Sequence, residues 1–109
     1  MKSLKFYNGL PELILSGVKT ATWRINDEKN ISVEDVLSLC RLNGEEFARA
    51  AVVSVKVTTF GKLTDEDKVG HEKYNSEMEM YDKFSSFYNT RVDSNTGLKV
   101  IKFKLQNAL

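Results

Sequence analysis

The pair Asn43-Gly44 constrains the fold of this chain more than any other local feature. Asn and Gly both adopt positive φ readily, which is what the tight turn of a β-hairpin requires. The segment before the pair, 36–42, and the segment after it, 47–60, are rich in apolar residues that alternate with polar ones. In the second segment, valines at positions 53, 55 and 57 alternate with Ser54 and Lys56. Alternation with a period of two is typical of strands, so these segments predict an antiparallel hairpin.

Before the hairpin, the sequence predicts a strand, a helix and a second strand. Apolar residues at 4 and 6 indicate a short first strand. Pro11 can occupy the first turn of a helix, and apolar residues at 10, 13, 14 and 18 follow at helical spacing. Gly17 is placed where a helix would stop. The segment 20–25 is then expected to be extended, followed by a polar loop over 26–30.

After the hairpin, Thr64 predicts the start of a short helix that ends near Gly70. Ser76 and Glu79 have the spacing of a capping box, which predicts a longer helix. Its expected apolar stripe consists of Met78, Tyr81, Phe84, Phe87 and Tyr88. Positions 93–97 resemble a turn, and 98–105 a closing strand whose apolar parity shifts after position 100. That shift indicates either a bulge or burial on both faces, as in a closing barrel. The predicted fold class is α+β, a small, mostly antiparallel sheet curled toward a β-barrel with flanking helices.

Length and composition favour one ordinary globular domain over 1–109. Of the 109 residues, 41% are hydrophobic and 28% are charged, which is usual for a soluble protein. No apolar run approaches the roughly 20 residues of a membrane helix. The N-terminal segment lacks the apolar core of a secretory signal, and the lone Cys40 cannot form an internal disulfide. These features predict a cytoplasmic protein that does not bind membranes and is a monomer.

Charge is distributed unevenly along the chain, although the net charge is only +1. Residues 1–24 carry four basic side chains and one acid, and 83–109 carry five basic side chains and one acid. Residues 64–82 carry seven acids and two lysines. If the two ends of the chain meet in one sheet, they would form a basic face that could hold a phosphate backbone. A solvated surface of mixed charge is an equally good interpretation of this pattern.

The segment 17–24 places an ammonium, two hydroxyls and a guanidinium within eight residues. In an extended chain, alternation would put Thr20, Thr22 and Arg24 on one face. Lys19, Ala21 and Trp23 would then lie on the other. An ordinary surface strand does not need this collection of polar groups. The segment is therefore a candidate site for an anionic or carbonyl-bearing ligand.

Each of these side chains also has an ordinary structural interpretation. A desolvated Lys19 could take the proton of Thr22 and make its hydroxyl a nucleophile, although such residues are commonly a solvated charge and a strand former. Arg24 could bind phosphate or carboxylate, or form a surface salt bridge to an acid at 27 or 28. Trp23 could stack on a base, or simply belong to the core.

Glu72 lies between two predicted helices, in a loop where functional groups are often presented. The neighbouring His71 is the sole histidine, so a Ser-His-Asp triad would have to use it. One Cys and one His, far apart in sequence, do not make a zinc site, and we expect no metal or other cofactor. The segment after Gly17 also lacks the spacing of a P-loop, which excludes nucleotide hydrolysis of that type.

In three features of its sequence, the chain resembles the ASCH domain family of the PUA-like superfamily. The first matching feature is the pattern Gly-x-Lys-x-x-x-x-Arg after a short helix, here Gly17, Lys19 and Arg24. The second is a strand that follows an acid, here 34–39. The third is a loop containing Glu and Gly before an aromatic-rich helix, with a closing strand at 100–103. Together these features span nearly the whole chain.

The resemblance implies a compact β-barrel with flanking helices and a cleft lined by the segment 17–24. It implies binding of RNA or a modified nucleoside, with Gly17, Lys19, Thr20, Thr22, Trp23 and Arg24 as ligand-binding residues. One small bacterial branch of the family hydrolyses N4-acetylcytidine with a Lys, a Thr three residues later and a Glu in the later loop. Lys19 and Thr22 match the first two positions, and Glu72 is the best match for the third.

Three functional hypotheses follow. The first is a binding domain for RNA or a modified nucleoside, with its polar cleft built on 17–24. The second is an amidohydrolase that acts on N4-acylated cytidine with Lys19, Thr22 and Glu72. The third is a protein-interaction domain whose acidic helix, 77–88, is the contact surface, which would require Met78, Met80 and Tyr81 to be exposed.

Overall fold

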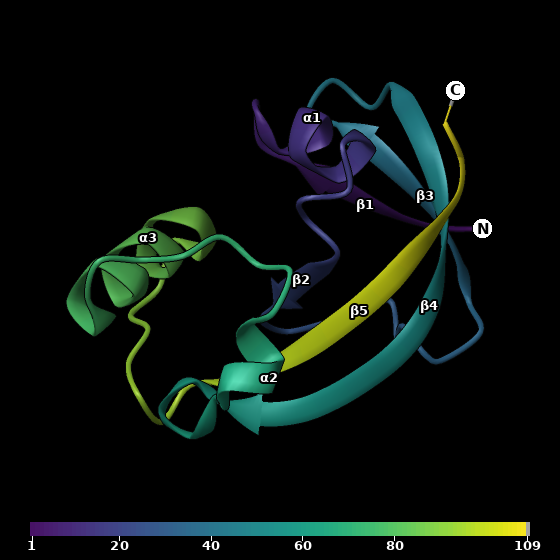
Figure 1. Cartoon of the computed structure of the whole chain (residues 1–109). Coiled ribbons are helices and arrows are strands. Elements are labelled where there is room, and N and C mark those ends of the chain that lie inside the picture. The colour runs from purple at the N-terminus through teal and green to yellow at the C-terminus, as the bar shows by residue number, and fades with distance from the viewer. Residues whose placement is uncertain (109) are drawn as a thin grey trace.

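Five strands form one curled sheet, and the helices lie beside it (Figure 1). The computed structural model describes residues 1–108, so Leu109, the last residue of the predicted domain, lies outside the described residues. The elements are β1 (Lys2–Phe6), α1 (Leu10–Leu15), β2 (Ala21–Arg24), β3 (Val36–Arg41), β4 (Glu46–Thr59), α2 (Asp65–Lys68), α3 (Glu77–Tyr88) and β5 (Gly97–Ala108). A single 3-10 turn, Phe60–Lys62, follows β4. Within residues 1–108, no helix is long and apolar enough to cross a membrane.

The strand order in the sheet is β1-β3-β4-β5-β2, which puts the two short N-terminal strands at opposite edges. β1 pairs with β3 in parallel, and all the other neighbours are antiparallel. β4 and β5 are long and strongly curved, and they carry the sheet from one end of the molecule to the other (Figure 1). The predicted α+β class with a curled, mostly antiparallel sheet is therefore confirmed.

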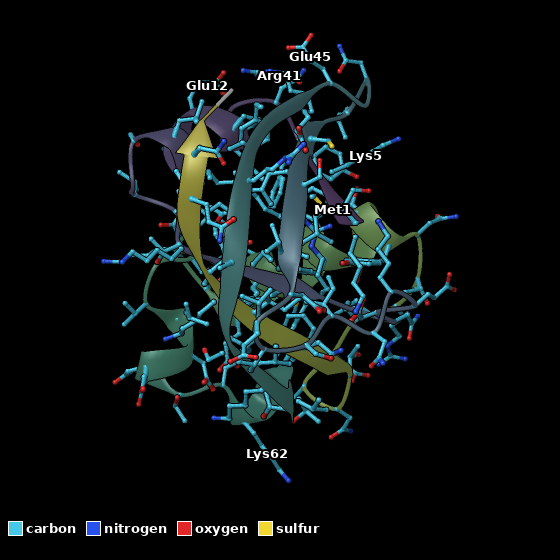
Figure 2. The ribbon with its side chains drawn as sticks, turned by 90° about the vertical axis from the view of Figure 1, so that its right-hand side faces the viewer. Met1, Lys5, Glu12, Arg41, Glu45 and Lys62 are labelled. Carbon is cyan, nitrogen blue, oxygen red and sulfur yellow. The ribbon has the colours of Figure 1, made fainter. Side chains whose placement is uncertain are left out.

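The predicted hairpin is formed by β3 and β4. Gly44 has a φ of 91°, and its amide donates to the Arg41 carbonyl oxygen at 2.9 Å. The Arg41 side chain pairs with Glu12 of α1 at 3.1 Å and with Glu45 of the turn at 3.8 Å. Figure 2 shows these three side chains together at the hairpin end of the molecule. The turn is thus fixed both by backbone conformation and by charge.

A bulge in β4 changes which valines face the core. The register of β4 against β5 shifts between Val52 and Ser54. Val52 is buried, whereas Val53 and Val57 are exposed and Val55 is half-buried. The alternating valines of the sequence therefore do not form one buried face, because the bulge at Val53 moves the strand out of phase.

β5 is buried on both faces, which resolves the parity shift seen in its sequence. Ile101 packs among aliphatic side chains, and Val100 packs on the opposite side against Trp23 and its aromatic neighbours. A curled sheet that closes on itself gives a strand this double burial. Of the two interpretations, burial on both faces explains the parity shift after position 100, because the pairing of β5 is regular there. The irregularities lie elsewhere, at Val53 of β4 and at Gln106 of β5.

The core has two parts. The first, which we call the aliphatic cluster, consists of Leu4, Phe6, Ile14, Ile31, Leu37, Leu39, Phe47, Ala48, Ala50, Val52, Ile101 and Phe103. The second, the aromatic cluster, consists of Trp23, Ile25, Phe60, Met80, Phe84, Val92, Leu98 and Val100, with Leu63, Tyr74, Tyr81 and Tyr88 packed against it. The first lies within the curl of the sheet, and the second joins β2 and β5 to α3.

The helices begin near the predicted residues, with one change in the buried face of α3. Ser76 caps α3 by accepting from the Glu79 amide at 3.1 Å, while the Glu79 carboxylate accepts from the Asn75 amide instead of completing the box. Met80 is buried and Met78 is exposed, so the predicted stripe was wrong at Met78. Because Met80 is buried, the continuous apolar surface that a protein-contact helix would need is interrupted.

Candidate functional site

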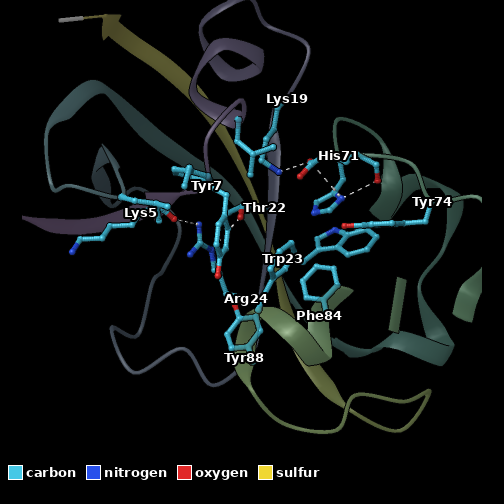
Figure 3. Close-up of a pocket in the computed structure, with 15 residues that line it drawn as sticks. Lys5, Tyr7, Lys19, Thr22, Trp23, Arg24, His71, Tyr74, Phe84 and Tyr88 are labelled. Carbon is cyan, nitrogen blue, oxygen red and sulfur yellow. Dashed lines mark hydrogen bonds and ion pairs between the residues drawn. The ribbon is translucent and has the colours of Figure 1, made fainter. Parts of the chain in front are cut away.

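A cavity of about 260 Å³ opens where the aliphatic and aromatic clusters meet (Figure 3). One wall comes from β1 and the loop after it, with Phe6 and Tyr7. The floor comes from β2 and the residues before it, and the opposite wall from the loop after α2. The C-terminal half of α3 closes the remaining side. The polar and aromatic residues that line the cavity include Lys5, Lys19, Thr22, Trp23, Arg24, His71, Glu72, Tyr74, Phe87 and Tyr88.

Arg24 lies between the two edge strands of the sheet. It belongs to β2, and its Nη2 donates to the backbone oxygen of Lys5 in β1 at 3.1 Å. Its guanidinium carbon also lies 4.9 Å from the ring centre of Phe6, a cation–π distance. The side chain therefore links the open edges of the curled sheet, which explains why an arginine can be held inside the fold at this position.

Arg24 lines the cavity and keeps N–H groups that its hydrogen bonds do not use. A guanidinium has five N–H groups, and the bonds formed by Arg24 are those from Nε to Thr22 Oγ1 at 3.1 Å and from Nη2 to Lys5. The alternative predicted from the sequence, a surface salt bridge between Arg24 and Asp27, is not formed, because Asp27 pairs with Lys99 at 2.7 Å. Among residues 1–108, no carboxylate forms an ion pair with Arg24. A cation in this position favours an anionic or carbonyl-bearing ligand.

Lys19 is turned into the protein by the end of α1. Gly17 has a φ of 83°, and the amides of Val18 and Lys19 both donate to the Leu13 carbonyl oxygen at 3.0 Å. As a result, Lys19 is only 3% exposed and lines the cavity. The predicted alternation of side chains between two faces over 19–24 was wrong at positions 19 and 20, because β2 begins only at Ala21. Lys19 and Thr22 therefore share the cavity, while Gly17 and Thr20 are exposed and do not line it.

Glu72 reaches Lys19 across 53 residues of sequence: Lys19 Nζ lies 2.6 Å from Glu72 Oε2. The loop that carries Glu72 is attached to the start of β2, because the Gly70 carbonyl oxygen accepts from the amides of Thr20 at 2.9 Å and Ala21 at 3.2 Å. Gly70 has a φ of 79°, and a Cβ at this position would lie 1.9 Å from Thr20 Oγ1. Glycine is therefore required for this close approach.

Burial and charge act in opposite directions on the Lys19–Glu72 pair. Burial is the largest influence on Lys19 and lowers its pKa below the usual value, while Glu72 opposes this effect. Burial would raise the pKa of Glu72, but its interactions with His71 and Lys19, including the hydrogen bond from Lys19, hold it below its usual value. The Lys19 ammonium is thus easier to deprotonate than that of an exposed lysine, and Glu72 is held toward its carboxylate form.

His71 supports this pair from behind. Its ring stacks on Trp23 with centroids 3.8 Å apart, and its Nδ1 lies 3.1 Å from the Glu72 carbonyl oxygen. Burial, together with the charge of Lys19, lowers the pKa of His71 to about 4, so the imidazole is neutral at pH 7. Sequence reasoning treated His71 only as a possible triad member. Its position next to Glu72 was the signal that it belongs to the site.

Trp23 belongs to the wall of the cavity. It is buried, His71 covers one face of its ring, and Phe84 lies 5.9 Å from it on a nearly parallel plane. Its indole nitrogen donates to the Asp67 carbonyl oxygen at 3.4 Å. The core interpretation of Trp23 therefore describes its packing, and its contribution to the site is to fix His71.

The cavity is also lined by aromatic side chains that the sequence analysis did not assign to a site. Tyr7 and Phe87 stack at its rim with ring centres 4.6 Å apart, although they are 45% and 42% exposed. The hydroxyl of Tyr88 accepts from the Ile25 amide at 3.2 Å, and burial raises the pKa of Tyr74. Phe87 and Tyr88 were assigned to the core stripe of α3. The end of that stripe instead borders the cavity.

The cavity thus combines a fixed cation, an ion pair, a hydroxyl and aromatic edges. In residues 1–108, no group of three or more His, Cys, Asp and Glu side chains is arranged to hold a metal ion. The donors come from Lys19 and Arg24, and the acceptors from Glu72 and Thr22. Such a site can bind a planar polar ligand through both kinds of hydrogen bond at once.

Solved structures share this architecture. An ASCH domain from Lactobacillus crispatus superimposes with a TM-score of 0.71, over 95% of this chain and 79% of that one, at 14% sequence identity. The chain has the fold of an ASCH domain. A Zymomonas mobilis ASCH protein gives a TM-score of 0.68 over 97% of this chain and 68% of its own, at 11% identity.

An Enterococcus faecalis protein, EF3133, has the same fold as well, with a TM-score of 0.75 over 94% of this chain and 72% of that one, at 16% identity. In sequence, no protein-family model and no curated protein matches this chain. The ASCH fold is thus supported by three-dimensional structure at low identity. What the chain binds must therefore be argued from its own residues.

Proposed function

We propose that the cavity binds a single nucleobase with its sugar, either as a modified nucleoside or as part of RNA. The observation that carries this proposal is Arg24, a guanidinium held in the cavity wall without a carboxylate partner in the described chain. A volume of about 260 Å³ suits one nucleoside and is too small for several stacked bases.

The pattern of donors and acceptors favours a base with both a carbonyl and an exocyclic amine. Carboxylates accept from the amine of cytosine, and arginine and lysine donate to ring nitrogens and carbonyl oxygens. Glu72 can therefore receive the amine edge while Arg24 and Lys19 face the oxygen. The aromatic side chains at the rim, Tyr7 and Phe87, offer flat apolar surfaces for the base or the sugar.

Equilibrium binding tests the proposal directly. Purified protein is titrated with cytidine, N4-acetylcytidine and uridine by calorimetry at low salt, where phosphate and charge contacts are strongest. We expect a cytidine to bind, and Arg24→Gln to weaken it about tenfold or more, since a hydrogen bond from a charged group contributes about 1.5–3 kcal/mol. Lys62→Gln makes the same change of charge in a side chain that points away at the far end of the molecule (Figure 2). Equal loss in both variants, or no binding by the wild type, would contradict the proposal.

A second candidate function is hydrolysis of an N4-acylated cytidine, and the Lys19–Glu72 contact favours it. Over a 2.6 Å hydrogen bond the lysine proton can move to the carboxylate, which leaves a neutral amine and a carboxylic acid. Lys19 then takes the proton of Thr22 as Oγ1 attacks the acyl carbon, and Arg24 holds the oxyanion. Glu72 gives its proton to the departing exocyclic nitrogen. Water finally cleaves the acyl–threonine ester and releases the carboxylic acid.

Turnover of N4-acetylcytidine, followed by the absorbance change on conversion to cytidine, tests this second function. Lys19→Ala and Thr22→Ala should abolish it, whereas Thr22→Ser keeps the hydroxyl and should retain part of it. An acylated Thr22 in the intact mass of quenched protein would identify the nucleophile. Unchanged turnover in Thr22→Ala would exclude this mechanism, and binding without turnover would leave the binding function alone.

A further inference from the structure

A second hollow shares the lining residue Arg24 with the cavity. It has a volume of about 410 Å³ and lies between β2, the start of β5 and the segment after α3. We call it the basic groove, and its polar lining residues are Arg24, Asn26, Asp27, Thr90, Arg91, Thr96 and Lys99. Arg24 lines both hollows, so a ligand that contacts Arg24 in the cavity lies next to the groove.

The groove carries more positive than negative charge. Its cations are Arg24, Arg91 and Lys99, and its acid is Asp27, which is already paired with Lys99. Arg91 is 90% exposed, and its Nε lies 3.8 Å from an oxygen of Asp93, a distance typical of weak surface pairs. The Arg91 guanidinium therefore remains available along the groove, and Thr90 and Thr96 line it as well. Arg24 adds those N–H groups that its hydrogen bonds to Thr22 and Lys5 do not use.

The hollow on the opposite side of the cavity has the reverse character. It has a volume of about 540 Å³ and contains Trp23, Phe60 and Met80. Its charged lining consists of Asp65, Glu72, Glu77, Lys68 and Lys73, three acids against two lysines. Glu72 is paired with Lys19, so the remaining charges of this hollow balance, and a negatively charged extension of a ligand would be attracted more strongly into the basic groove.

We propose that the basic groove binds the phosphate group of a nucleotide whose base and sugar occupy the cavity. Guanidinium forks and threonine hydroxyls are the usual partners of phosphate oxygens, and Arg24 would hold the junction between nucleoside and phosphate. The proposal rests on the nucleoside site proposed above and refines its ligand to a phosphorylated one. The phosphate belongs either to a free nucleotide or to an RNA strand.

Titrations at low salt test the groove. Whichever of cytidine and N4-acetylcytidine binds is compared with its 3′- and 5′-monophosphates and with a trinucleotide that carries it at the centre. We expect at least one phosphorylated form to bind about tenfold more tightly than the nucleoside. Arg91→Gln should remove most of that gain and leave nucleoside binding unchanged. Lys73→Gln, the same change in an exposed lysine of the opposite hollow, should have no effect.

The same titrations also distinguish a free nucleotide from an RNA strand as the source of the phosphate. Tighter binding of the trinucleotide than of either monophosphate, with a salt slope that falls by about 0.7 in Arg91→Gln, would assign the groove to an RNA strand. Monophosphates that bind as tightly as the trinucleotide would assign it to a free nucleotide. Equal affinity for nucleoside and all phosphorylated forms, or equal effects of Arg91→Gln and Lys73→Gln, would contradict phosphate binding in the groove. Neither result would contradict the nucleoside site. If the nucleoside itself did not bind, both the nucleoside site and the phosphate site would be contradicted.

Discussion

The aliphatic and aromatic clusters are both buried, yet they differ in what is buried with them. The aliphatic cluster contains aliphatic side chains and three phenylalanines, and no ionisable group belongs to it. The aromatic cluster packs against tyrosines, and its Trp23 carries the buried His71 on its face. One cluster therefore holds the sheet together, and the other also positions polar groups.

This difference explains where the cavity lies. Polar side chains can be buried only where hydrogen bonds or ion pairs accompany them. Lys19 satisfies this condition through Glu72 at the border of the two clusters, where β2 begins and the loop after α2 approaches. The aliphatic side supplies Phe6, on which Arg24 packs, and the aromatic side supplies Trp23, on which His71 stacks. Stability and ligand binding should therefore separate between the two regions.

A cavity in the aliphatic cluster should give the largest loss of stability with the least change at the site. Leu39 is fully buried in the centre of β3. Leu39→Ala should lower the free energy of unfolding by about 4 kcal/mol, through lost burial and the space left behind. Urea unfolding measures this loss, and calorimetry at a temperature where the variant is folded should give unchanged nucleoside affinity. A tenfold change in affinity would show that the two regions are not separable in this way.

Acid should act on the aromatic side through His71. Its pKa is about 4 in the folded chain and about 6.5 when unfolded, so the unfolded chain binds the proton more tightly. The resulting stabilisation is complete above pH 6.5 and is lost as the pH falls toward 4, by about 3 kcal/mol in total.

Urea midpoints of the wild type and of His71→Gln, measured between pH 4 and 7.5, test this dependence. The variant should be less stable at pH 7 and should have a shallower pH dependence below 6.5. Subtraction of the two curves removes the contribution of the carboxylates. Parallel curves would show that His71 titrates normally, which would require its environment to be wet.

Gly70→Ala should act where the two regions meet. The positive φ and the predicted contact of the new Cβ with Thr20 together should destabilise the chain by about 2 kcal/mol. The loop would also move Glu72 away from Lys19, so ligand affinity should fall. Gly44→Ala is the matched control, since its φ is 91° and nothing lies within 4 Å of its added Cβ. The control should show only the smaller conformational cost and normal affinity.

The sequence predicted the aliphatic region better than the aromatic one, for physical reasons. Strand period, the Asn-Gly turn and the helix stop at Gly17 are local signals, and they placed β3, β4 and α1 within a residue or two. The phase of β4 was not predictable from its valines, because the bulge at Val53 depends on pairing with β5. Met80 was likewise buried by its partners in the aromatic cluster, and the spacing of α3 alone did not indicate this.

The site was predicted in its parts more than in its arrangement. Lys19, Thr22, Arg24 and Glu72 were named from residue type and family resemblance, and the structure brings all four to one cavity. Strand alternation separated Lys19 from Thr22, because it could not foresee that β2 begins after position 20. The rim residues Tyr7 and Phe87 come from elements 80 residues apart, and no local pattern joins them.

That rim contact offers the smallest and sharpest test of how the regions are joined. Tyr7 follows β1 on the aliphatic side, Phe87 belongs to α3 on the aromatic side, and their rings stack although both are partly exposed. A double-mutant cycle with Tyr7→Ala and Phe87→Ala should give a coupling of about 1 kcal/mol in urea unfolding. Zero coupling would mean that α3 is held to the sheet by the buried aromatic cluster alone. With the expected coupling, both single variants should also weaken nucleoside binding, because the stacked pair borders the cavity, whereas Leu39→Ala should leave it unchanged.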